Sequence, residues 1–184
     1  YSPVTDTNVD LAATGENQKS DFGESVSLDG QWLAVGQAEG GGSVIDPSNK
    51  SGNVYLFSYD DTSDYSGGTL QAVIGEGRST NFSLEEDYEN GDQFGKSVSV
   101  FKGRLAVGSK EADGYNHPFG AGGSGEVHLF TFNDDVTAYD GVTHQATIGY
   151  DYNPATTISQ TGHASGSKNI DLGEDFSTNA TGAS

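Results

Sequence analysis

The chain repeats one pattern of four blocks, and each block returns about 72 to 74 residues later. A Phe-Gly-x-Ser-Val-Ser block is followed by Leu-Ala-Val-Gly, then by Ser-Gly-x-Val-x-Leu-Phe, and then by Gln-Ala-x-Ile-Gly. The blocks begin at Phe22, Leu33, Ser51 and Gln71 in the first copy and at Phe94, Leu105, Ser124 and Gln145 in the second. In repeat proteins one unit cannot bury its own apolar face and stacks on a neighbour. The sequence therefore predicts stacked units of one kind.

Each copy has the pattern of four short strands. No segment shows helical periodicity over three turns, and 27 glycines with only 33% hydrophobic residues favour short strands joined by turns. In the third strand both Val54 and Leu56 on one side and Tyr55 and Phe57 on the other are apolar, and the second copy is similar, which predicts that this strand is covered on both faces in both copies. The predicted strands are Gly23–Leu28, Trp32–Gly36, Asn53–Tyr59 and Leu70–Ile74, then Gly95–Val100, Arg104–Gly108, Glu126–Phe132 and His144–Ile148.

The expected fold class is all-β. Glycine in Asp29-Gly30 and Lys102-Gly103 predicts tight hairpins between the first and second strands. We divide the chain into the end of a preceding repeat (1–20), a first repeat (21–75), a polar segment (76–92), a second repeat (93–149), a Ser/Thr-rich segment (150–170) and the start of a third repeat (171–184).

The charge balance excludes several classes of protein. The chain has 27 acidic and 8 basic residues, a formal net charge of -19, so nucleic acid is not expected as a partner because phosphate binding needs a basic face. There is no cysteine, which excludes disulfides, thiolate zinc sites and cysteine nucleophiles. No apolar run is long enough to span a bilayer.

Acidic residues cluster on the predicted loops, and calcium is the one cofactor that they suggest. Ca²⁺ takes six to eight oxygen ligands from carboxylates, carbonyls and water. The alternative is a set of solvated turns, because Asp and Asn side chains bond their own backbone there. The best single segment is Asp87–Asp92. The candidate ligands are Asp60, Asp61, Asp64, Asp87, Glu89, Asp92, Asn133, Asp134, Asp135 and Asp140.

Three Asn-x-Ser/Thr sequons fall in predicted loops or ends, at Asn49, Asn81 and Asn179. Such sequons accept N-linked glycans in secreted proteins, and loops or ends tolerate the bulk of a glycan. The sequence thus predicts three glycosylation sites for a chain that passes through a secretory pathway.

Catalytic patterns are absent from the sequence. The four histidines, His117, His128, His144 and His163, have no metal-ligand spacing, and no nucleophile elbow or phosphate-binding loop is found. Trp32, the only tryptophan, is either a packing residue or a sugar-stacking platform, and its place at a strand start favours packing. We therefore do not expect an enzyme.

The repeated blocks resemble the FG-GAP repeat family, the units of integrin alpha-subunit propellers and of many microbial and algal surface proteins. Phe22-Gly23 and Phe94-Gly95 match the "FG", and the two Leu-Ala-Val-Gly blocks match part of the "GAP", with Gln37-Ala38 and Ser109-Lys110 where the family usually has Ala-Pro. The resemblance implies four-stranded blades of a β-propeller. Two full repeats and partial ends are not enough to close a ring alone.

The resemblance also implies structural roles for six residues. Phe22 and Phe94 would anchor the blades, and Gly23, Gly36, Gly95 and Gly108 would permit close backbone approach.

These features predict a non-enzymatic extracellular or cell-surface protein, structural or adhesive, with the repeating subunit of a surface filament as one candidate role. Open ends with exposed apolar faces favour head-to-tail self-association or contact with further blades of a larger chain, and heterologous contacts that do not close make filaments. Glycans or surface proteins are further candidate partners. One alternative is an integrin-like, calcium-assisted ligand-binding propeller fragment. The other is a propeller-supported enzyme acting on polysaccharide, for which no carboxylate pair stands out.

Overall fold

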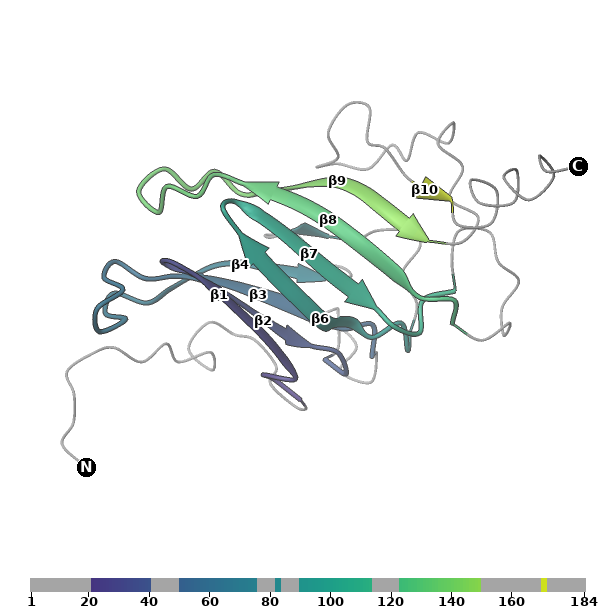
Figure 1. Ribbon diagram of the computed structural model, residues 1–184. Helices are drawn as coiled ribbons and strands as arrows, with labels where there is room; N and C mark the ends of the chain where they lie inside the picture. Colours follow the sequence, from purple (N-terminus) through teal and green to yellow (C-terminus); the bar gives the residue numbers. More distant parts are fainter. Residues whose placement is uncertain are drawn as a thin grey trace, which may run out of the picture.

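The computed structural model describes residues 21–40, 50–75, 82–83, 90–113, 123–149 and 170–171. These residues form two β-sheets that lie one on the other, and none of them is helical (Figure 1). The fold class is all-β, as predicted, and the two sheets of the described chain do not form a closed ring.

The first sheet has the order β1-β2-β3-β4-β5, with strands Ser25–Asp29, Trp32–Gln37, Asn53–Ser58, Thr69–Gly75 and Phe82–Ser83. The second has the order β10-β9-β8-β7-β6, and its strands in chain order, β6 to β10, are Phe94–Phe101, Arg104–Ser109, Glu126–Phe132, Val142–Gly149 and Ile170–Asp171. Four strands of each sheet pair antiparallel, whereas the two-residue strands β5 and β10 pair parallel at an outer edge. Each sheet is thus one sequence copy, folded as a meander.

All eight predicted strands are confirmed, with boundaries that shift by no more than two residues. Even the irregularities repeat, because the register between the third and fourth strands shifts after Leu56 in one sheet and after Leu129 in the other. The sequence did not predict β5 and β10, which lie in or beside the segments expected to be polar connections. Two residues are too short to leave a period-2 pattern.

The turns between first and second strands follow the glycines. Lys102 and Gly103 form a two-residue loop with positive φ at both residues, 45° and 68°, as a type I′ turn requires. In the first sheet Asp29 pairs with Trp32, so the loop residues are Gly30 and Gln31 rather than the predicted Asp29-Gly30.

One hydrophobic core lies between the two sheets. It joins Ala34, Val54 and Leu56 of the first sheet to Leu105, Val107 and Phe130 of the second. The two sheets therefore face each other with different sides. The first sheet contributes the side that carries Val54 and Leu56, and the second contributes the side that carries Phe130, whose counterpart in the first copy is Phe57. The sheets therefore stack head-to-tail. Each sheet has one side equivalent to that of Val54 and one side equivalent to that of Phe130.

The third strands show the consequence of this arrangement. Every residue of β3 is buried, so the prediction of two covered faces is confirmed there. In β8 the same prediction is wrong, because Val127 is 38% exposed and Leu129 is only partly buried. No second described sheet lies over that side of β8. An apolar strand face in the sequence shows only that the face can be buried. Whether it is buried depends on the tertiary structure.

Candidate interaction surfaces

The junction between the sheets is made by the start of β6, which lies against β1 and β2 (Figure 1). The backbone of Phe94 and Gly95 enters a slot whose walls are Gly36 and Gly52. A Cβ atom added at Gly36 would overlap the carbonyl oxygen of Gly95, and one added at Gly52 would overlap that of Phe94. Only glycine leaves room for the second sheet to approach so closely.

Hydrogen bonds fix the backbone of the second sheet in this slot. The Ser25 hydroxyl donates to the Gly95 carbonyl oxygen at 2.7 Å, and the Phe94 amide donates to the Ser51 carbonyl oxygen at 2.8 Å. Farther along β6, the Val100 amide donates to the Ser27 hydroxyl oxygen at 3.0 Å. The junction is therefore polar along its backbone and apolar at its centre.

At the other end of the junction Trp32 of β2 covers the loop that joins β8 and β9. Its ring lies 4.7 Å from that of Phe132 and 5.6 Å from that of Tyr139, and its indole N–H donates to the Asp134 carbonyl oxygen at 2.8 Å. Trp32 is only 4% exposed, which bears out packing rather than sugar stacking.

A charged pair closes the slot on its outer side. The Lys96 ammonium of the second sheet contacts the Glu24 carboxylate of the first. This hydrogen bond to Glu24 raises the pKa of Lys96 above its ordinary value. Lys96 occupies the place in its copy that Glu24 occupies in the first copy, so the pair joins equivalent positions with opposite charge.

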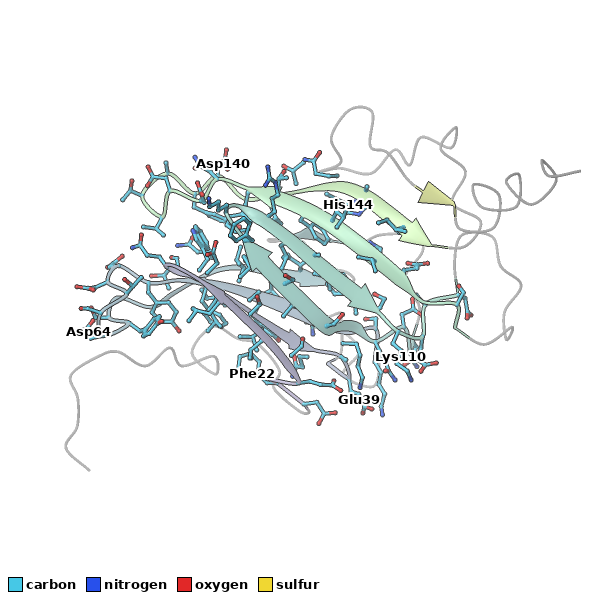
Figure 2. The ribbon with its side chains drawn as sticks, in the orientation of Figure 1. Phe22, Glu39, Asp64, Lys110, Asp140 and His144 are labelled. Carbon is cyan, nitrogen blue, oxygen red and sulfur yellow. The ribbon has the colours of Figure 1, made fainter. Side chains whose placement is uncertain are left out.

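In the first sheet, several apolar residues equivalent to those that β6 places in the junction are exposed. Phe94 is fully buried, whereas its counterpart Phe22 is 42% exposed, and Figure 2 places Phe22 at the outer margin of the sheet. Val100 is 5% exposed and its counterpart Leu28 is 51% exposed. Val26 and Tyr65, also exposed, correspond to Val98 and Tyr139, which pack against the core. We call the exposed set of Phe22, Val26, Leu28 and Tyr65 the leading surface.

The second sheet has an equivalent of the slot, and no segment of the described residues fills it. A pocket of about 520 Å³ lies there, lined among others by Ser97, Gly108, Ser124, Gly125 and Val127. These residues are the counterparts of Ser25, Gly36, Ser51, Gly52 and Val54, which hold the start of β6 in the first copy. We call this pocket, with Lys96 and the exposed Phe101 and Arg104, the trailing surface.

The acidic loops fold as self-capped turns. The Asp61 carboxylate accepts from the Ser63 amide at 2.7 Å, and the Asp135 carboxylate accepts from the Thr137 hydroxyl at 2.7 Å and amide at 2.9 Å. These bonds, from Ser63 and from Thr137, lower the pKa of each carboxyl. Asp64 and Asn133 accept similar bonds two residues ahead, from Ser66 and Asp135.

The calcium candidates are spread over several parts of the chain. Asp60, Asp61 and Asp64 lie between β3 and β4, whereas Asn133, Asp134, Asp135 and Asp140 lie between β8 and β9, and Figure 2 labels Asp64 and Asp140 in these two loops. Asp92 is buried beside the start of β6, and Asp87 and Glu89 lie outside the described residues. Within the described ranges no three acids or histidines gather as a metal site. Calcium binding stays a prediction.

The sequons at Asn49, Asn81 and Asn179 all lie outside the described residues, so glycosylation also stays a prediction. Of the residues given structural roles, Gly36 and Gly95 meet at the junction, and Gly23 and Gly95 share a positive φ of 93° and 90°. Phe94 is a buried anchor, but among the described residues the ring contacts of Phe22 are with Tyr55 and Phe57 of its own sheet.

Sequence reasoning missed a buried polar chain in the second sheet. The imidazole of His128 contacts the Glu126 carboxylate at 3.1 Å, and the Thr147 hydroxyl lies 3.2 Å from His128 Nδ1 and from His144 Nε2. Residues 126 and 128 are two apart on one strand, which places them on one face. The sequence did not show that β9 would place Thr147 and His144 beside them. All four side chains are buried in the described structure, so we assign them to packing.

The family comparison agrees with the fold. The family model for the FG-GAP repeat matches residues 7–57. This part of the chain is an FG-GAP repeat. The resemblance stated from the sequence is thereby confirmed for the first copy, and the second copy has the same blocks and the same strand order as this FG-GAP repeat. No curated protein and no solved structure matches the chain. FG-GAP repeats are typical of extracellular or surface proteins. Among the described residues no helix is long and apolar enough to cross a membrane.

Proposed function

We propose that this protein is a non-enzymatic extracellular component, structural or adhesive, that works by associating head-to-tail with copies of itself. The observation that carries the proposal is the position of the exposed apolar side chains. The large hydrophobic side chains that are exposed in the described structure are Phe22, Val26, Leu28, Tyr65, Phe101 and Val127. Four belong to the leading surface and two to the trailing surface. Apolar groups gathered in this way favour association.

Heterologous contact between the two surfaces repeats without closing unless the rotation between subunits forms a ring. A filament or a ring is therefore the expected product. The acidic charge of -19 supports the same role, because self-repulsion keeps such subunits soluble and makes assembly depend on a specific contact.

Electron microscopy of the purified chain, combined with sedimentation velocity over a wide range of protein concentration, tests this proposal. We expect assemblies that grow with concentration, as fibres with a regular axial repeat or as closed discs. A monomer at every concentration would refute it.

A further inference from the structure

The contact between the two sheets of one chain is a template for a contact between two chains. We infer that the Phe22-Gly23 segment of one copy inserts into the pocket beside Gly108 and Gly125 of another copy, in the way that Phe94-Gly95 inserts between Gly36 and Gly52. This inference rests on the proposed function of head-to-tail association, and it names the surfaces, the residues and the register of that association.

The inserted segment already has the required shape. Gly23 has φ 93° and Gly95 has φ 90°, and a Cβ at Gly23 would meet nothing within 4 Å, whereas one at Gly95 would meet the first sheet. Phe22 contacts the rings of Tyr55 and Phe57 of its own sheet, as Phe94 contacts those of His128 and Phe130. Phe22-Gly23 thus has the same structure as Phe94-Gly95, but no second sheet of the described residues lies in front of it.

The pocket retains the groups that hold the template. Ser97 stands for Ser25, whose hydroxyl donates to the Gly95 carbonyl oxygen, and the Ser124 carbonyl stands for that of Ser51, which accepts from the Phe94 amide. In the proposed contact the Ser97 hydroxyl donates to the carbonyl oxygen of Gly23. The Ser124 carbonyl accepts from the amide of Phe22. Glycines at positions 108 and 125 leave the room that those at 36 and 52 leave.

The charges are complementary as well. In the contact between chains, Lys96 of one copy takes the place of Glu24 in the template, and Glu24 of the other copy takes the place of Lys96. Each of these groups already pairs within its own chain, so the contact brings two such pairs of opposite charge together. At the far end Arg104 takes the place of Trp32, and Asp61 takes the place of Asp134. A guanidinium thus faces an acidic loop in the proposed contact, where an indole faces a carbonyl in the template.

The proposed contact reproduces the β6 part of the template. Within one chain β6 lies against β1 and β2, and the core between the sheets adds to the junction. Between chains, β1 of a second copy takes the place of β6 and lies against β6 and β7 of the first. The face of the first sheet around Val35, Tyr55 and Phe57 is already buried and does not have to open. Phe22, Val26 and Leu28 are themselves exposed, so the leading surface is accessible without unfolding either copy.

Disulfide trapping tests the register, because the chain has no cysteine of its own. The template bond from the Val100 amide to the Ser27 hydroxyl corresponds, between chains, to Leu28 beside Ser99. A mixture of the single variants Leu28→Cys and Ser99→Cys is oxidised and run on a non-reducing gel. We expect a disulfide-linked heterodimer. The matched control mixes Ser99→Cys with Thr137→Cys, an exposed position in the β8–β9 loop that lies outside both surfaces, and should give little product.

Sedimentation of two variants tests the insertion itself. Gly108→Ala places a methyl group where the Gly23 carbonyl oxygen would lie, while within one chain it meets only the rotatable Ser97 hydroxyl and more distant atoms. Phe22→Ala removes the inserted ring. We expect each variant to stay folded by circular dichroism and to raise the dissociation constant about tenfold or more, the usual size of an overpacking or hot-spot loss.

The outcomes separate this inference from the proposed function. Association with the heterodisulfide, weakened by both variants, supports both. Association that Gly108→Ala leaves unchanged, without the heterodisulfide, overturns this interface and leaves head-to-tail assembly by another surface. A chain that stays monomeric at every concentration overturns both. If Gly108→Ala destabilises that monomer as strongly as Gly36→Ala does, a segment of the same chain fills the pocket instead.

Discussion

Adding one methyl group at equivalent glycines should give opposite results in the two sheets. Gly36 and Gly108 hold the same position in the repeat and both lie in a second strand, β2 or β7. A Cβ at Gly36 would lie 2.9 Å from the carbonyl carbon of Gly95 and closer still to its oxygen, which is backbone of the second sheet. A Cβ at Gly108 would meet the hydroxyl end of Ser97, which can rotate, and its other neighbours are 3.7 Å or more away.

The expected loss of stability in Gly36→Ala depends on which groups must move to admit the methyl group. To relieve Gly36→Ala the sheets must separate at the slot, which costs about 1–3 kcal/mol as overpacking. Separation also weakens the Ser25–Gly95 and Phe94–Ser51 hydrogen bonds, each worth about 1 kcal/mol. We therefore expect Gly36→Ala to lower the free energy of unfolding by about 3–5 kcal/mol. Gly108→Ala should change it by less than about 1 kcal/mol, because a strand alanine also restricts the unfolded chain.

Urea unfolding followed by tryptophan fluorescence measures this difference. Trp32 is the only tryptophan and lies in the junction, so its emission reports the separation of the sheets directly. The protein is kept dilute so that association does not add to stability. If the two variants are destabilised equally, within about 1 kcal/mol, the slot is not what holds the sheets together. The contact between the sheets is then no template for a contact between chains.

Four further predictions concern the junction, the buried polar chain of the second sheet and the acidic loops. Phe94→Ala should lower the free energy of unfolding by about 3–5 kcal/mol because the ring is fully buried, whereas Phe22→Ala should cost about 1 kcal/mol in the monomer; equal losses in urea melts would contradict the junction. Burial, with the nearby Asp140, raises the pKa of Tyr139 to about 12. The folded state therefore holds this proton more tightly than the unfolded state, so stability should fall as the pH rises from about 10 to 12, and Tyr139→Phe should flatten that part of the profile. His144→Leu, which places the leucine of the first copy in the second, should change stability by no more than about 1 kcal/mol; a larger loss would mean that the buried polar chain stabilises the sheet. Millimolar calcium should raise the melting temperature over that in a chelator if the acidic loops bind it, and identical melts would refute the calcium prediction.

The local structure of each sheet could be predicted from the sequence. Strand periodicity and turn glycines depend on residues within one copy, so the eight long strands, their order and the Lys102-Gly103 turn followed from pattern alone. The two-residue strands β5 and β10 did not, because their pairing depends on a partner edge and not on their own sequence. For the same reason the buried contact of His128 with Glu126 and Thr147 could not be foreseen.

The sequence by itself determined that each copy has two apolar sides and a glycine at each point of close approach. Only the tertiary structure decided which sides are covered, because burial depends on a second sheet that arrives from elsewhere. Val54 and Val127 illustrate this, since the same residue at the same place in the repeat is fully buried in one sheet and 38% exposed in the other. Phe22 and Phe94 differ in the same way. Identical local patterns therefore become a core in one copy and an interaction surface in the other.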